Sequence, residues 1–181
     1  MAEMTLKDWG LWTEGADGAD YCQSLYELAK HFKCNNGLEI GVRMCKSAYA
    51  FLMANDSSTL LGIDPNPEFP VSEFMDSMGM NDRFTWIRGA SPEATEPLKF
   101  KKFDWIYIDG RHDYEGVKQD WFVVKDMVAP GGIIVFDDNR EGLGYGTDVP
   151  RFLNDFGIKY KTNEDFGLTP NPHYAAVVVN E

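Results

Sequence analysis

The sequence lacks long apolar runs. It contains no window of about eighteen uninterrupted apolar residues, the length that a membrane-spanning helix needs. Its first residues also lack the basic segment followed by an apolar segment that marks a secretory signal. The 3 cysteines show no C-x-x-C spacing, which argues against a disulfide framework or a zinc site. These absences predict a protein of the reducing cytoplasm with no membrane span.

The sequence also has fewer basic residues than acidic ones. The chain has 17 Lys and Arg against 29 Asp and Glu, so its formal net charge is −12. Beyond Lys99, Lys101 and Lys102 there is no cluster of basic residues suited to contacting phosphates. Nucleic acid and anionic membrane surfaces are therefore not expected as partners.

Linkers, internal repeats and low-complexity tracts are absent as well. With 181 residues, of which 44% are apolar, the chain is large enough for a full core, and we predict one domain over residues 1–181. Residues 1–17 carry Trp9 and Trp12 among glycines and acidic residues. We interpret this segment as an arm or a lid, and the sequence does not decide between them.

The most informative stretch runs from Phe103 to Asp138 and reads as strand, acidic loop, helix, Pro-Gly-Gly turn and strand. Residues 103–108 and 132–136 are apolar runs, typical of strands covered on both faces. Between them, helical spacing predicts one buried face, formed by Val117, Trp121, Val124 and Val128. Such a unit crosses over right-handed, so its strands are parallel and end at one edge of the sheet. In open α/β sheets the ligand crevice lies outside that edge.

The rest of the chain alternates in the same way. We expect further helices at residues 18–33, 46–54, 71–78 and 148–156 with a short one from Ser91, and strands at 38–42, 59–63, 84–87, 157–161 and 174–179. Strands and helices that alternate and then end in two consecutive strands predict a doubly wound α/β sheet with an antiparallel hairpin at its C-terminal end.

Glycine and acidic residues follow the first two predicted strands. Glu39 and Gly41 end the first strand, where glycine lets a ligand approach the backbone; a plain tight turn explains this equally well. Arg43 and Cys45 stand where a dinucleotide-binding turn needs further glycines, which disfavours NAD and FAD. Asp64 follows the second strand, roughly where one carboxylate accepts hydrogen bonds from both hydroxyls of a ribose. The alternative is a turn aspartate before proline.

Acidic residues also follow the two strands of the central unit, namely Asp109, Asp137 and Asp138. Hard divalent cations such as Mg²⁺ prefer carboxylate oxygens, so these residues are candidate metal ligands; solvated acids are the alternative. His112 and Asp113 lie in the loop beside them. A histidine that titrates near neutral pH suits a general base. Alternatively, His112 orients the loop or contacts a carboxylate of the cofactor.

Four motifs within residues 36–140 share the pattern of one protein family. They read L-E-I-G-V-R-M-C-K-S, then G-I-D, then I-D-G-R-H-D-Y-E-G-V-K-Q-D, and finally P-G-G-I-I-V-F-D-D. Together they resemble the small class I S-adenosylmethionine-dependent methyltransferases, and within them the macrocin and related sugar O-methyltransferases. The resemblance implies a Rossmann-like sheet with strand order 3-2-1-4-5-7-6 and strand 7 antiparallel.

The resemblance also implies roles for individual residues. The expected cofactor contacts are Glu39 and Gly41 at the methionine and ribose parts, Asp64 at the ribose hydroxyls, Gly89, Ala90 and Ser91 by the adenine, and Asp109 at the cofactor's edge. The expected magnesium ligands are Asp109, Asp137 and Asp138. The sugar O-methyltransferases place an acidic base two residues after the first ligand, but this chain has Arg111 there. His112 or Asp113 is the substitute candidate.

These observations predict an S-adenosylmethionine-dependent enzyme that methylates a hydroxyl of a small acceptor, a sugar or a catechol-like diol, with a divalent metal. The alternatives are an NAD-type nucleotide-binding protein and a non-catalytic member of the fold, the latter favoured by Arg111. An RNA methyltransferase is disfavoured by the net charge of −12. Because the chain shows no separate substrate domain, we expect an acceptor site that is open or completed by a second subunit of a homo-oligomer.

Overall fold

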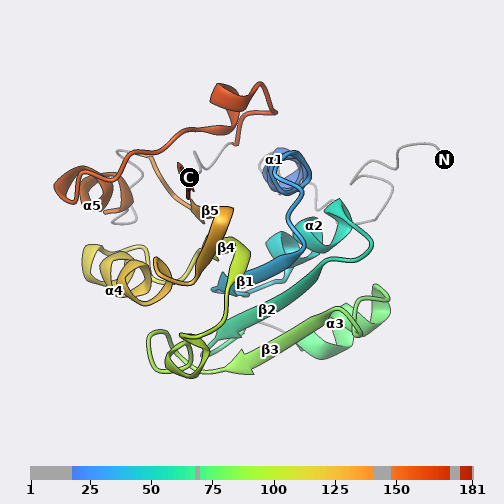
Figure 1. Cartoon of the computed structure of the whole chain (residues 1–181). Helices are drawn as coiled ribbons and strands as arrows, with labels where there is room; N and C mark the ends of the chain where they lie inside the picture. Colours follow the sequence, from blue (N-terminus) through green and yellow to red (C-terminus); the bar gives the residue numbers. More distant parts are fainter. Residues whose placement is uncertain (1–17, 68–69, 141–147, 172–175, 181) are drawn as a thin grey trace.

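A computed structural model describes residues 18–67, 70–140, 148–171 and 176–180. The predicted N-terminal arm or lid at residues 1–17 lies outside this part of the chain. The fold has three layers, with a twisted sheet between two groups of helices (Figure 1). Both faces of the sheet are covered, as the apolar composition of its strands predicts.

The sheet has six strands in the order β3-β2-β1-β4-β5-β6. Their bounds are β1 Asn36–Ile40, β2 Thr59–Asp64, β3 Phe84–Arg88, β4 Phe103–Ile108, β5 Val128–Phe136 and β6 Ala176–Val179. The first five strands pair in parallel, and β6 pairs antiparallel to β5. This confirms the predicted Rossmann-like α/β fold and its strand order.

One predicted strand is reduced to a single contact. Residues 157–161 were expected to form a strand, but only Lys161 makes an isolated antiparallel bridge, with Val177 of β6. Lys159, Tyr160 and Lys161 are all exposed, and only Ile158 of this segment packs against the core, so the segment has too little apolar surface to form a buried strand. The described residues therefore form six strands where the sequence predicted seven.

The helices divide between the two faces of the sheet. In Figure 1, α1 Gly18–His31, α2 Lys46–Ala54 and α3 Val71–Ser77 lie on one side, and α4 Tyr114–Val124 and α5 Val149–Asp155 lie on the other. One core contains Leu25, Phe51 and Trp105, and the other contains Ile106, Val117 and Phe152. Trp105 and Ile106 are neighbours in β4 and point to opposite cores, as a strand with a period of two residues requires.

Two local predictions were wrong. The short helix expected from Ser91 is a series of turns followed by the 3₁₀-helix η2, Glu96–Leu98. Val128, expected on the buried face of a helix, is the first residue of β5 and pairs with Phe103. The α4 helix ends at Val124, because the chain turns and Met127 then accepts a hydrogen bond from the Phe103 N–H. Tertiary pairing overrides helical spacing here.

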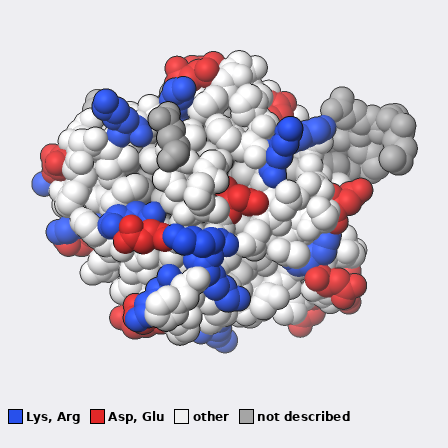
Figure 2. Space-filling model, in the orientation of Figure 1, with Lys and Arg blue, Asp and Glu red and all other residues white. Residues whose placement is uncertain are grey.

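Charge of both signs is spread over the surface. Figure 2 shows Lys and Arg side chains interspersed with Asp and Glu, with several basic side chains gathered near the middle of the displayed face. The acidic excess of the sequence therefore does not form one continuous acidic surface on this face. In the described part of the chain, every helix is too short or too polar to cross a bilayer.

The turn after β1 passes very close to the turn after β4. Gly41 has a φ of +92°, and a Cβ on this residue would lie 2.0 Å from the carbonyl oxygen of Asp109. No side chain fits there, so glycine is required both for its positive φ and for the close approach of two backbones. The turns after β1 and β4 can meet only because of this residue.

We expect Gly41→Ala to lower the free energy of unfolding by more than about 3 kcal/mol, because the added methyl group must push two backbone segments apart. The matched control is Gly79→Ala, since Gly79 also has positive φ, +69°, but open space around it. The Gly79→Ala substitution should lower the free energy of unfolding by only about 1–2 kcal/mol. Urea unfolding followed by circular dichroism measures both, and equal losses would contradict the crowding at Gly41.

Candidate functional site

The residues that follow the parallel strands continue the hydrogen-bond ladder of the sheet. The Gly41 N–H donates a hydrogen bond to the Ile63 carbonyl at 2.8 Å, and the Asp109 N–H donates one to the Ile40 carbonyl at 2.8 Å. The Asp137 N–H donates to the Ile108 carbonyl at 3.0 Å, and the Gly89 N–H donates to the Asp64 carbonyl at 3.1 Å. Each turn is therefore anchored to a neighbouring strand before it leaves the sheet. This places the predicted site residues together at the carboxyl edge, as expected for a doubly wound fold.

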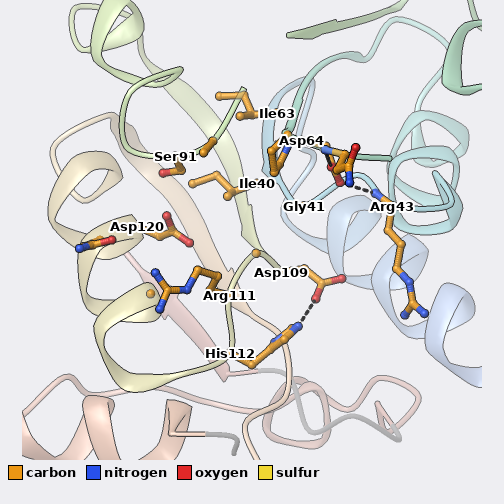
Figure 3. Close-up of a pocket in the computed structure, with 16 residues that line it drawn as sticks. Ile40, Gly41, Arg43, Ile63, Asp64, Ser91, Asp109, Arg111, His112 and Asp120 are labelled. Atoms are coloured by element: carbon orange, nitrogen blue, oxygen red, sulfur yellow. Dashed lines mark hydrogen bonds and ion pairs between the residues drawn. The ribbon is translucent and has the colours of Figure 1, made fainter. Parts of the chain in front are cut away.

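Two adjoining cavities lie at this edge. The larger has a volume of about 390 Å³ and opens between the ends of β1, β2 and β4 and the helix α4 (Figure 3). Of the predicted cofactor residues, it is lined by Gly41, Asp64, Ala90, Ser91 and Asp109. The smaller has a volume of about 240 Å³ and is lined by Tyr21, Ser47, Asp137 and Asp138, among others. Arg43, Asp109 and His112 border both cavities.

Asp64 lies on the wall of the larger cavity and is held by backbone groups. Its two carboxylate oxygens accept hydrogen bonds from the N–H of Arg43 at 2.8 Å and of Asn66 at 2.7 Å. Each oxygen has a second lone pair for a further donor. The turn-aspartate and ribose interpretations are therefore compatible, because these two bonds orient the carboxylate without exhausting its capacity as an acceptor.

Glu39 and Gly89 do not line either cavity. Glu39 is 1% exposed and lies beneath the first turn, where Ser47 Oγ donates a hydrogen bond to its Oε1 at 2.5 Å. Burial raises the pKa of Glu39 to about 8; the Ser47 hydrogen bond opposes this, and the nearby Asp64 charge adds to it. Glu39 reaches the smaller cavity only through Ser47, which lines it.

His112 stands between two of the three predicted metal ligands. Its Nδ1 lies 2.9 Å from Asp138 Oδ2, and its Nε2 lies 3.5 Å from Asp109 Oδ1. The hydrogen bond to Asp138 raises the pKa of His112, and burial opposes this. Burial and the neighbouring charges of Asp137, Glu39 and Asp138 raise the pKa of Asp109 well above its usual range. The predicted carboxylates are therefore brought together, with an imidazole among them.

This arrangement does not present a set of ligands to a metal ion. Among the described residues, no group of three His, Cys, Asp or Glu side chains has a geometry suited to one. One oxygen of Asp109 and one of Asp138 contact His112. The predicted magnesium ligands are thus neighbours whose arrangement does not fit the ion.

Asp113, the other candidate base, has a structural role. It is the N-cap of α4, accepting a hydrogen bond from the Gly116 N–H at 3.0 Å, and it pairs with Arg111 at 2.8 Å. The Gly116 hydrogen bond lowers the pKa of Asp113 below its usual value. Asp113 lines neither cavity, so of the two candidates only His112 borders the site.

Sequence reasoning missed several residues that line the cavities, among them Asp120 and Tyr21. Asp120 lines the larger cavity and is 4% exposed, and Tyr21 lines the smaller one. Asp120 could have been found, because it lies three residues after Val117 and four before Val124, on the apolar face of the helix. Tyr21 had no such signal, since an aromatic residue on a buried helix face is ordinary core.

The buried Glu39 predicts a specific dependence of stability on pH. Its pKa rises from 4.5 to about 8 on folding, so the folded protein holds this proton more tightly than the unfolded chain. The free energy of unfolding should therefore fall as pH rises between these values, by up to about 1.4 kcal/mol per pH unit from this group. Glu39→Gln should remove that decline. Urea unfolding at pH 5 and pH 8 measures it, with the exposed Glu115→Gln as control; parallel declines in all three proteins would contradict the burial of Glu39.

Comparison with known proteins adds independent findings. Residues 38–139 match the model of the family Methyltransf_24, a methyltransferase domain. Among curated proteins, none matches the chain. The fold is similar to the O-methyltransferase TomG from Streptomyces achromogenes, involved in tomaymycin synthesis and solved with S-adenosylmethionine, with a TM-score of 0.69, 16% identity, and coverage of 92% of this chain and 82% of that one.

Two further structures show the same fold. An O-methyltransferase from Bacillus cereus in complex with S-adenosylhomocysteine gives a TM-score of 0.67 at 15% identity, covering 97% of this chain and 86% of that one. The S-adenosylhomocysteine-bound methyltransferase PaMTH1 from Podospora anserina gives 0.64 at 18% identity, covering 87% and 76%. Since the family match spans more than half of the sequence, the chain belongs to the Methyltransf_24 family of methyltransferase domains.

Proposed function

We propose that this protein transfers the methyl group of S-adenosylmethionine to a hydroxyl of a small acceptor, a sugar or a catechol-like diol. The observation that carries the proposal is the meeting of two cavities at Asp109 and His112. One cavity has an oriented acid suited to a ribose, and the other has an imidazole suited to a hydroxyl. Family membership favours this function over the dinucleotide-binding alternative.

The cofactor is assigned to the larger cavity. Asp64 would accept hydrogen bonds from the ribose hydroxyls, since both of its oxygens are oriented and each has a free lone pair. Gly41 leaves the backbone open to the cofactor, and Ala90 and Ser91 would border the adenine. The methionine part would then extend toward Asp109, beside the smaller cavity, where the methyl group meets the acceptor.

The acceptor is assigned to the smaller cavity, with His112 as general base. Asp138 orients the ring through Nδ1, and Nε2, which lies 3.5 Å from Asp109 Oδ1, is the nitrogen that would take the proton of the acceptor hydroxyl. The acceptor oxygen then attacks the methyl carbon in line, a C–O bond forms, and the C–S bond breaks to leave S-adenosylhomocysteine. Positioning the two reactants supplies much of the rate gain in such a transfer.

The acidic edge also carries the magnesium hypothesis derived from the sequence. Asp109, Asp137 and Asp138 provide the hard oxygen atoms that Mg²⁺ prefers. The His112 contacts to Asp109 and Asp138 compete with such a site, however. The mechanism proposed above therefore assigns no step to a metal.

We expect His112→Gln to lower turnover by about 10²–10⁴-fold, the usual contribution of a general base, while leaving S-adenosylhomocysteine affinity unchanged. Calorimetry measures the affinity, and methyl transfer to a panel of catechols and sugars measures the turnover. His31→Gln is the matched control, because His31 lies at the end of α1 and lines neither cavity. Absence of S-adenosylmethionine and S-adenosylhomocysteine binding by the wild type would refute the proposed function.

Removal of divalent metal gives a separate prediction. Turnover by the wild type should persist in excess EDTA, because the proposed base and its orienting carboxylate need no metal. The same acceptor panel, assayed with EDTA and then with added Mg²⁺, measures this. Loss of turnover that Mg²⁺ restores would instead favour the magnesium hypothesis and show that the His112 contacts rearrange in the working enzyme.

A further inference from the structure

A third acidic residue, besides Asp64 and Asp109, lines the larger cavity, opposite the one assigned to the ribose. Asp120 belongs to α4, and Figure 3 shows it on the helix side of the cavity, across from Asp64. In the same view Ile40 and Ile63 lie between these two carboxylates, and Ser91 lies beside Asp120. The cavity therefore has one acid at each end and apolar side chains between them.

The surroundings of Asp120 offset its charge only in part, through the nearby charges of Arg111 and His112. The side chain is 4% exposed, and among the described residues neither a backbone N–H nor a basic side chain is hydrogen-bonded to its carboxylate. Burial raises the pKa of Asp120 to about 6, opposed by the neighbouring Ser91 hydroxyl. A buried carboxylate with so little compensation is costly unless a ligand supplies donors.

Ser91 strengthens this interpretation. Its hydroxyl oxygen is buried, and no described residue gives it a hydrogen bond of ordinary geometry. It lies close enough to Asp120 to lower the pKa of that carboxyl. Together the two side chains offer a strong acceptor beside a hydroxyl that can donate or accept.

This pair matches one edge of adenine. The exocyclic amine N6 is a donor, and the adjacent ring nitrogen N1 is an acceptor. With the ribose at Asp64, the base of an adenosine would extend past the apolar side chains Ile40 and Ile63 toward α4. Ala90, which also lines the cavity, has no polar side chain that could bind the amine.

We propose that Asp120 selects adenine in the cofactor by accepting a hydrogen bond from the N6 amine, with the Ser91 hydroxyl beside it at N1. The proposal rests on the proposed function, because it presumes that the adenosine part of S-adenosylmethionine occupies the larger cavity. It assigns Asp120 a role in specificity that is separate from methyl transfer itself.

The test compares S-adenosylhomocysteine with S-inosylhomocysteine, which carries an oxygen acceptor in place of N6 and a donor at N1. The wild type should bind the adenosine compound about 10–100-fold more tightly, since the inosine compound places an oxygen against the buried carboxylate. Asp120→Asn should bind both compounds with similar affinity, because an amide can donate to oxygen or accept from the amine. Asp120→Ala should lose about 10-fold in S-adenosylhomocysteine affinity and also lose the preference.

Calorimetry with each ligand measures these affinities, and thermal unfolding followed by circular dichroism shows that each variant is folded. Glu115→Ala is the matched control, because Glu115 is an acidic residue of the same helix with a side chain 61% exposed. It should keep both the affinity and the preference of the wild type. If Asp120→Ala does not fold, the nearly isosteric Asp120→Asn still tests whether Asp120 causes the preference for the adenosine compound.

The outcomes separate this proposal from the function on which it rests. Wild-type binding of S-adenosylhomocysteine, with affinity and preference unchanged in Asp120→Asn, would overturn the adenine assignment and leave the methyltransferase function intact. Binding of neither compound by the wild type would overturn both. Loss of the preference in Asp120→Asn but not in Glu115→Ala would establish Asp120 as the residue that recognises the base.

Discussion

The parallel hydrogen-bond ladder extends past the ends of the strands, and the position of the site depends on it. Gly41, Asp109 and Asp137 each donate an N–H to the adjacent strand before the chain turns away. Their positions are thus determined by the register of β1, β2 and β4, not by the loops alone. This brings the turns after β1 and β4 so close that only glycine fits at position 41.

The same geometry crowds acidic groups into a small volume. Glu39, Asp109 and Asp137 lie near one another with little exposure, and burial together with mutual repulsion raises the pKa of Asp109. Arg43 partly offsets the charge of Asp109, and His112 contacts Asp109 and Asp138. A site with this charge favours ligands that bring positive charge, as the sulfonium and ammonium groups of S-adenosylmethionine would under the proposed function.

Two aspartates of helix α4 and its cap have different roles, one in the fold and one in the cavity. Asp113 caps its first turn and is paired with Arg111 at the surface, so its carboxylate is fully engaged. Asp120, two turns later, faces inward and lines the larger cavity. The two residues have the same chemistry, and only their partners give them different roles.

The sequence by itself determined the fold class and the edge of the sheet at which the site lies, while the strand order was implied by the resemblance of its motifs to a family. Apolar strands alternating with helices leave few topologies, and parallel strands place Asp64, Asp109 and Asp137 at one edge. Only the tertiary structure decided which carboxylates are buried and which contact His112. Whether Glu39 is buried or Asp138 holds His112 depends on contacts between residues that are distant in the sequence or lie on different elements, and local pattern carries no information on such contacts.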